Sequence, residues 1–495
     1  MLALLALPLL ASSTARAGDF MDVWVSTALE DTNVFAGPEA ESPSANFVTR
    51  GNSTFFENYE SRTTGDISRA QLVLYKKDDS FFKNWWTEGA FVLRYTPYLN
   101  PSNTDPGTNI EDDGSYVRIV RTLPGEHHDL SITGYAVDSD RFRLGYSYDL
   151  SWGGREIFAF TAGAAPGIRV QYQNHGSYAF VGAKTAIGDF RDEATNDFRN
   201  QTYYGMLSGA GVQIADRLKL EAAFGSFQQG QFLNVDNTDS QLYGNMIVAM
   251  GMAGQIAFRS RTDLDFIQSA DLRLYRNEPD NVRDSYTSHP QIDGVGIIVQ
   301  TEVDRLSHNL LNATDPNSTV IENGYAGDLQ TLVVAGTANF GADLVYKDLA
   351  YIVFNVPGLT SNFAMNPTME RTPQLYGRLH GEYYIEKAHL TPALGVGLMQ
   401  PATYTVEGNT YVQQTDRSKE AVPDGQAPAA ILSGIAGVQL DLSKSVVTSG
   451  EILYTVNNNL SNYVTDPTTG EGVREPAPAD QRNALGFNLI MRARF

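Results

Sequence analysis

The strongest constraint on this chain is a two-residue alternation of apolar and polar side chains. In RFRLGYSYDLSW (141–152) the even positions are Phe, Leu, Tyr, Tyr, Leu and Trp, and the odd positions are Arg, Arg, Gly, Ser, Asp and Ser. Side chains of a β-strand point alternately to its two faces, so this pattern predicts a strand with one apolar and one polar face. A soluble sandwich would bury the apolar face in a core. A membrane barrel would turn it to lipid and point the arginines into a wet lumen.

The same alternation recurs along the whole chain. It is clear in GVQIADRLKLEAAF (211–224), in QLYGRLHGEYYIEKAHLTPALGVGL (374–398) and in GVQLDLSKSVVTSGEILYTV (437–456). Each stretch contains a tight turn, at 215–217, 386–388 and 443–445, whereas acidic or Asn/Asp/Gly-rich segments of about 10–30 residues separate other stretches. Short turns on one side and long loops on the other are typical of outer-membrane barrels.

The last residues, NALGFNLIMRARF (483–495), are the most specific motif. Phe487, Leu489 and Met491 occupy alternate positions that lead to the carboxyl-terminal Phe495, and the positions between them hold Asn488, Ile490, Arg492 and Arg494. An amphipathic final strand that ends on an aromatic residue resembles the signal read by the barrel-assembly machinery. A soluble chain has little reason to end in this way, because termini are usually frayed and polar. This motif therefore favours the membrane barrel, in which the apolar faces of the strands meet lipid, over the soluble sandwich.

Hydrocarbon offers no hydrogen bonds to the backbone, so a sheet in a membrane must close on itself. We therefore predict an all-β, transmembrane antiparallel barrel of the bacterial outer membrane with about 18–20 strands. Some 21 candidate strands can be marked in the sequence. Because such barrels have an even number of strands, we expect that one of the segments marked between about 276 and 374 is not a strand. Residues 1–17 are predicted to be a signal peptide, because an apolar stretch precedes a small-x-small cleavage pattern, and 18–495 to be the barrel.

Composition excludes several classes of function. The chain has no cysteine, which excludes disulfides and thiolate chemistry. Its net charge of −21 argues against a nucleic-acid partner. The acidic runs have no calcium-loop spacing, and we predict neither a metal site nor a cofactor. Expected partners are outer-membrane lipid, lipopolysaccharide and the barrel-assembly machinery, and a homo-oligomer is left open.

The polar faces predict a charged lumen. Facing charges of both signs resemble the constriction of general and substrate-specific porins. Segments 400–428 and 457–482 are candidates for a loop that folds inward. The candidate pore-lining residues are Arg69, Arg94, Arg118, Arg141, Arg143, Asp149, Arg169, Glu221, Arg273, Arg378, Glu382, Glu451 and Arg492.

Catalysis is not expected. The densest cluster of histidine and acidic residues is EHHD at 126–129. We interpret it as an exposed turn, because no oriented nucleophile or water accompanies it. Zinc between the two histidines is unfavourable, since adjacent strand residues point to opposite faces.

Three phrases, SRAQLVLYKKD (68–78), EDDGSYVRI (111–119) and SDRFRLGYSYDLSWGG (139–154), resemble a group of porin-like outer-membrane barrels from myxobacteria and their relatives. That group has no assigned activity to transfer. The sequence therefore predicts a passive, porin-like channel for small polar or anionic solutes. The alternatives are a barrel that exports a polysaccharide and a non-conducting structural or adhesive barrel.

Overall fold

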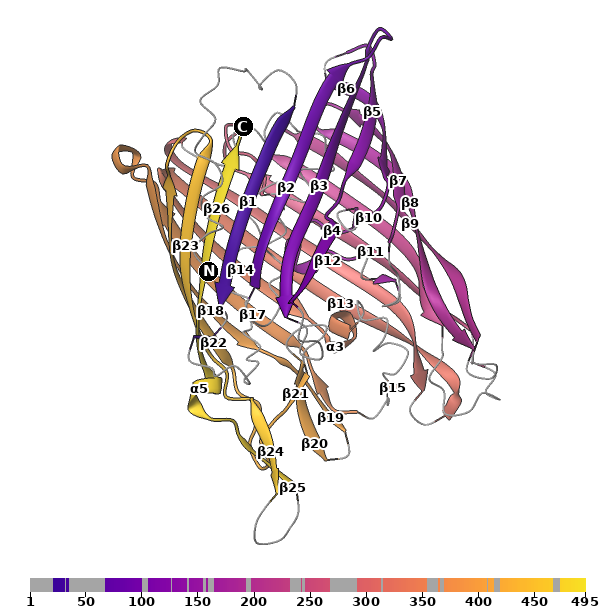
Figure 1. The fold of residues 1–495 in the computed structure, drawn as a ribbon, viewed down its shortest axis with the longest axis vertical. Coiled ribbons are helices and arrows are strands. Elements are labelled where there is room, and N and C mark those ends of the chain that lie inside the picture. Colours follow the sequence, from indigo (N-terminus) through magenta and orange to yellow (C-terminus); the bar gives the residue numbers. More distant parts are fainter. Residues whose placement is uncertain are drawn as a thin grey trace.

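The alternating stretches become tilted strands that close on themselves (Figure 1). The computed structural model of the chain describes residues 21–31, 33–34, 67–99, 106–125, 127–139, 142–154, 157–158, 164–192, 197–231, 242, 245–267, 292–312, 315–353, 364–365, 369–406, 408–413, 419–465 and 472–495. The predicted signal peptide at 1–17 lies outside these residues.

In the described part of the chain, 18 strands form one antiparallel barrel, within the predicted range. β4 (Pro106–Asp112) and β5 (Tyr116–Thr122) follow one another beside β3 (Trp85–Leu99) and count as one strand of the barrel. The other 17 are β1 (Asp22–Asp31), β2 (Ile67–Asp79), β3, β6 (His128–Tyr135), β7 (Gly167–Asn174), β8 (Ser177–Asp192), β9 (Asp197–Ala215), β10 (Leu218–Gln231), β11 (Met246–Arg259), β12 (Ile292–Asn312), β13 (Asp315–Gly336), β14 (Ala338–Lys347), β17 (Gln374–Tyr383), β18 (Leu390–Gln400), β22 (Ile431–Asp441), β23 (Val446–Val456) and β26 (Asn483–Arg494).

The first and last strands pair with each other and seal the barrel. Their register runs from Trp24 opposite Arg494 to Asp31 opposite Phe487. Short turns and the carboxyl terminus share one end, the upper end in Figure 1. An even number of strands separates the turns at 215–217 and 386–388, so both lie at that end, as predicted.

In the described residues between 276 and 374, where we expect one strand to be marked wrongly, one apolar run is not a strand. Residues 315–347 form the β13–β14 hairpin, but the apolar run that follows is α3 (Leu349–Ile352), a single helical turn capped by the Asp348 side chain. An apolar run of this length does not by itself distinguish a strand from a buried helical segment.

Smaller elements lie mainly at the opposite, long-loop end (Figure 1). A four-stranded sheet there contains β16, β19, β20 and β21, and a hairpin contains β24 and β25. The segments 400–428 and 457–482 thus form small sheets in their described parts, and the loop that enters the lumen is a different one. The bounds are β15 (Ala364–Met365), β16 (Arg371–Thr372), β19 (Ala402–Val406), β20 (Asn409–Gln413), β21 (Lys419–Ala421), β24 (Ser461–Thr465), β25 (Gly472–Pro476), α5 (Ala479–Arg482) and the 3-10 turns η2 (Tyr148–Leu150) and η5 (Glu386–Ala388).

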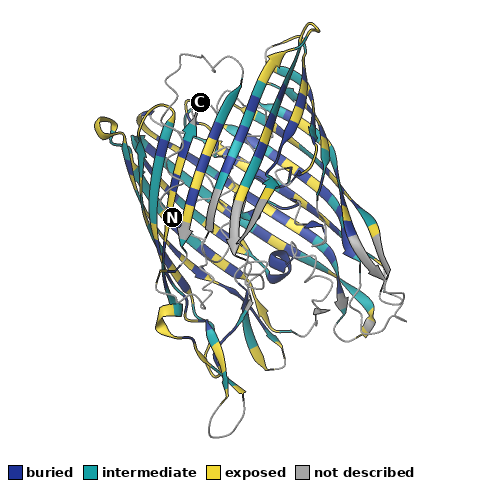
Figure 2. Ribbon diagram, in the orientation of Figure 1, coloured by how far each residue is buried: buried dark blue, intermediate teal, exposed yellow. Residues whose placement is uncertain are grey.

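The outer face of the barrel is apolar and the inner face is mixed. On β5, Val117 and Ile119 are 62% and 43% exposed, whereas Arg118 between them is 2% exposed. Figure 2 shows the same alternation of buried and exposed residues along most strands. A closed antiparallel barrel with an apolar outer surface is the form in which strands cross the outer membrane, and this chain is an outer-membrane barrel.

Among the described residues, no helix combines the length and the apolarity that crossing a bilayer requires.

Replacing Leu394 with arginine tests the lipid-facing surface. This side chain lies on β18 and is 68% exposed, so a charge there would enter hydrocarbon. We expect the free energy of unfolding in lipid vesicles to fall by about 2–4 kcal/mol if the residue lies near the midplane. Ser445→Arg, in the turn after β22, is the matched control and should leave the urea midpoint unchanged. Equal midpoints for the two variants would contradict the assignment of this face to lipid.

Candidate functional site

The described residues between β6 and β7, which are 136–139, 142–154, 157–158 and 164–166, fold into the barrel, and we call them the lumen loop. Its described residues contact inward-facing side chains of several strands, from Lys184 on β8 to Arg378 on β17. Leu144 and Trp152 exchange two backbone hydrogen bonds of 2.7 and 2.8 Å, which make the loop a narrow hairpin. The prediction that 141–152 is a membrane-spanning strand is therefore wrong.

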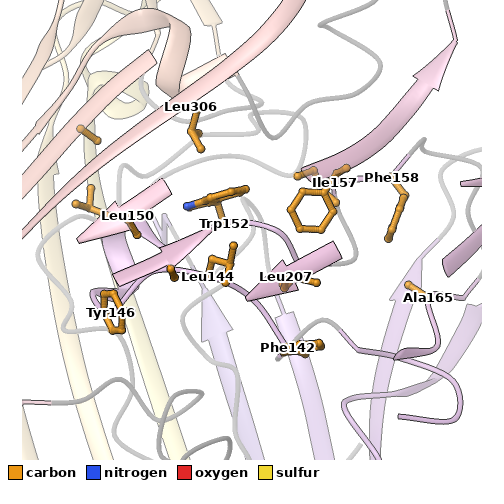
Figure 3. Packing of buried hydrophobic residues seen from close by; sticks show 14 of the residues in the cluster. Phe142, Leu144, Tyr146, Leu150, Trp152, Ile157, Phe158, Ala165, Leu207 and Leu306 are labelled. Carbon is orange, nitrogen blue, oxygen red and sulfur yellow. The ribbon is translucent and has the colours of Figure 1, made fainter. Parts of the chain in front are cut away.

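The apolar face of the lumen loop packs against the inner wall rather than lipid (Figure 3). Phe142, Leu144, Leu150 and Trp152 are at most 1% exposed. The Trp152 ring meets the ring of Phe227, on β10, edge to face at a centroid distance of 5.7 Å. A small apolar core therefore lies inside the barrel.

Glycines on the wall provide the space for these rings. A Cβ atom at Gly251, on β11, would lie 2.7 Å from the Trp152 ring, and one at Gly225, on β10, would lie 2.6 Å from Leu144. A Cβ at Gly182, on β8, would overlap the Phe142 ring. These are inward positions of the strands, so small residues there are a shape requirement of the lumen loop.

Charged side chains of the wall hold the backbone of the lumen loop. Glu302, on β12, accepts hydrogen bonds from the amides of Tyr146 (2.8 Å) and Ser147 (2.5 Å). Lys184 donates from Nζ to the carbonyl oxygens of Ser139 and Gly153, both at 2.7 Å. Hydrogen bonds to charged groups are stronger than neutral ones, so the loop is fastened on two sides.

An ion pair fastens the tip of the lumen loop. Arg378 lies 2.8 Å from Asp149 of the loop and 2.6 Å from Asp343 of β14. Burial raises the pKa of the Asp149 carboxyl, but Arg378 and Lys347 lower it, and the net pKa is below its ordinary value. The stabilisation from this pair is present at neutral pH and is lost as the pH falls through that lowered pKa.

A second inward element supports the first. Asp348 caps the first turn of α3, and the Tyr351 hydroxyl of that turn contacts the carbonyl oxygen of Leu150 at 2.5 Å and Asp304 Oδ2 at 2.8 Å. On its other side α3 packs with the small sheet, through Leu349 and Tyr404. The lumen loop, α3 and the long-loop end are thus in continuous contact.

The wall formed by β2, β3 and β5 carries a buried ion pair. Arg118 Nη1 lies 2.8 Å from Glu88 Oε1, and the two side chains are 2% and 0% exposed. The hydroxyl groups of Tyr75 and Tyr116 donate to Glu88. The Trp86 ring covers the guanidinium of Arg118 at 5.0 Å.

The predicted pore-lining residues lie in different parts of the structure. Arg94, Arg118, Arg169, Glu221, Arg378, Glu382, Glu451 and Arg492 lie on the inner faces of described strands. Arg143 and Asp149 lie on the lumen loop instead of on a strand. Arg69 lies in β2 opposite Ala28. Arg141 and Arg273 lie outside the described residues.

The sequence reasoning missed Lys184, Glu302, Asp304 and Asp328, which contact the lumen loop or lie beside its contacts. A signal for two of them was available. In VQTEVDRLSH (299–308) the apolar residues Val299 and Val303 alternate with Gln300, Glu302 and Asp304, which places both acids on the inner face.

No protein-family model matches this sequence, and no curated protein matches it. Solved structures similar to it include three from Pseudomonas aeruginosa. OpdK with vanillate is 8% identical over 96% of this chain and 98% of that chain, with a TM-score of 0.46. OccK5 (OpdH) is 9% identical over 96% and 98%, with a TM-score of 0.45. OpdL is 10% identical over 96% and 97%, with a TM-score of 0.42. At these values the likeness does not extend to particular residues.

Proposed function

We propose that the chain is a passive, porin-like channel for small polar or anionic solutes. The observation that carries the proposal is the lumen loop, which enters a barrel of 18 described strands and is fastened to its wall by charged side chains. Barrels of about 16–18 strands leave an aqueous channel. A loop fixed to one wall narrows such a channel and leaves the passage along the opposite wall.

The opposite wall supplies the proposed preference for anions. Arg94, on β3, is 23% exposed at its side chain, far more than Arg118. It lies 2.6 Å from Glu111 and 3.5 Å from Asp113. A partly exposed guanidinium beside carboxylates offers a passing anion a donor and gives the passage a local field.

Single-channel recordings in planar bilayers test both parts of this proposal. We expect conductance steps with a preference for anions. Arg94→Gln should lower the anion-to-cation permeability ratio, and Glu111→Gln, which removes the opposing charge, should raise it. Because the two variants change one ion pair in opposite senses, a shift of the same sign in both would remove this pair from the pathway. Silence of the purified, folded protein would overturn the channel.

One observation favours a non-conducting barrel as the second candidate. Val92 on β3 and Ile431 on β22 face inward, are fully buried and belong to the same apolar cluster as Trp152 of the lumen loop, so packed apolar residues also lie on these strands. Absence of conductance steps, with a heat-shifted band that shows a folded barrel on a denaturing gel, would select this candidate.

We further propose that outer-membrane lipid, including lipopolysaccharide, contacts the apolar outer face, and that the barrel-assembly machinery reads the last strand. The supporting observation is that Phe487, Leu489, Met491 and Phe495 are all exposed on the outside of β26 or just after it.

A further inference from the structure

Three carboxyl groups gather on the wall beneath the lumen loop. Glu302 and Asp304 are inward residues of β12, and Asp328 of β13 lies directly opposite Glu302 in the register of the two strands. Glu302 and Asp304 are fully buried, and Asp328 is 5% exposed. Like charges directly opposite each other on neighbouring strands destabilise a sheet, so this arrangement needs compensation.

The contacts of the three groups show what form the compensation takes. Glu302 accepts two amide hydrogens of the lumen loop, and Asp304 Oδ2 accepts the Tyr351 hydroxyl. Asp304 and Glu302 lie two residues apart on the same inner face of β12, which places their carboxyl groups side by side. Two carboxyl groups can share a hydrogen bond only when one of them carries a proton.

The unused oxygens support the same interpretation. Among the described residues, Oδ1 of Asp304 and Oδ1 of Asp328 have no hydrogen-bond donor. If Asp304 carries a proton on Oδ1, this hydroxyl group donates a hydrogen bond to the carboxylate of Glu302. Two carboxyl groups that are too close for both to ionise share a proton in this way.

The neighbouring charges do not neutralise the cluster. Arg378 is already paired with Asp149 and Asp343. The titratable and charged groups that face the cluster come from the lumen loop, β14, β17 and α3; they are Asp149, Asp343, Lys347, Tyr376, Arg378 and Tyr351. The two carboxylates among them, Asp149 and Asp343, balance the two cations, Lys347 and Arg378, so no cation is left over for the three clustered acids.

We propose that Glu302, Asp304 and Asp328 form a proton-dependent latch for the lumen loop. The docked loop holds a proton between Asp304 and Glu302. When the pH rises and this proton leaves, three facing negative charges repel one another and the loop undocks. The docked state binds more protons than the undocked state, so falling pH favours docking and rising pH favours release. Asp149 is ionised throughout the neutral and alkaline range, because its pKa is lowered, and does not contribute to this transition.

A spin label on the lumen loop tests the latch without reference to conductance. The chain has no cysteine, so Ser151→Cys offers a single attachment site on the half-buried side of the loop. The label is followed by electron paramagnetic resonance in the folded protein from neutral pH upward, stopping below the ordinary tyrosine pKa of about 10. We expect a reversible rise in label mobility with pH. Unchanged mobility across this range would overturn the proposal.

Two variants and a control separate the latch from a general effect of alkali. Asp304→Asn replaces the shared proton with an amide N–H, so the label should remain immobile at every pH. Asp328→Asn removes one opposing charge and should move the transition to higher pH. Glu386→Gln, in the exposed turn after β17, should leave it unchanged. A transition that is the same in Asp304→Asn as in the parent protein would also overturn the latch.

Gel mobility of unheated samples at each pH shows whether the barrel stays folded. Conductance recorded on the same preparations separates the latch from the channel. A mobile label without conductance would count against the channel alone, and conductance with an immobile label would count against the latch alone.

Discussion

Replacing Gly251 with leucine is expected to force the lumen loop out of its seat and to enlarge the passage. The first added carbon would already lie 2.7 Å from the Trp152 ring, and it would overlap the Leu306 side chain. Overpacking of this kind costs about 1–3 kcal/mol, which is comparable to the hydrogen bonds that hold the loop. We therefore expect a larger single-channel conductance and a mobile label at residue 151 already at neutral pH.

The control for this variant lies on the same strand. Gly254 is three residues away, and the nearest atom to a Cβ placed there is a backbone oxygen at 3.9 Å. Gly254→Leu should therefore keep the parent conductance and an immobile label. A Gly251→Leu protein that folds with parent values in both measurements would show that the loop does not depend on this space.

Alternation predicted the strands well because a strand with one apolar and one polar face shows this pattern directly in its sequence. The last strand illustrates this: Phe487, Leu489 and Met491 face outward as expected, and Arg492 is buried inside. The same rule failed at 141–152. Alternation shows that a segment has an apolar face, but it does not show whether that face meets lipid or another protein surface.

The partner of that apolar face could not be found from local sequence. Trp152 packs against residues on β10 and β12, and the carboxylate that holds Tyr146 is 156 residues away, at Glu302. Only the closure of the barrel brings these positions together. The inward direction of Glu302 could be predicted from the alternation of β12, but its contact with the loop could not.

For the buried pair of Glu88 and Arg118, alternation predicts that each side chain points into the barrel, but it does not predict that the two residues pair with each other. The two residues are directly opposite in the register of β3 and β5. The register between β3 and β5 depends on the break between β4 and β5, where Gly114 takes a φ of 99° that suits glycine. A one-residue shift would have turned one partner toward lipid.

Arg118→Met should therefore destabilise the barrel strongly. Glu88 would lose its cationic partner, and the hydroxyl groups of Tyr75 and Tyr116 would remain as its donors among the described residues. Removing one partner of a buried ion pair costs about 3–5 kcal/mol. Urea unfolding in vesicles measures the loss. Adding Glu88→Gln to Arg118→Met should recover much of it, because the second change removes the stranded charge.

The matched comparison is an exposed pair on the neighbouring strand. Lys76 and Asp78 lie 3.3 Å apart with side chains that are 36% and 60% exposed. Lys76→Met should cost at most about 1 kcal/mol, since water screens such pairs. If Arg118→Met and Lys76→Met cost the same, the lumen at Glu88 is as wet as the surface. If only Arg118→Met is costly and Glu88→Gln reverses it, the wall is dry there, because the missing partner and not the missing side-chain volume sets the loss.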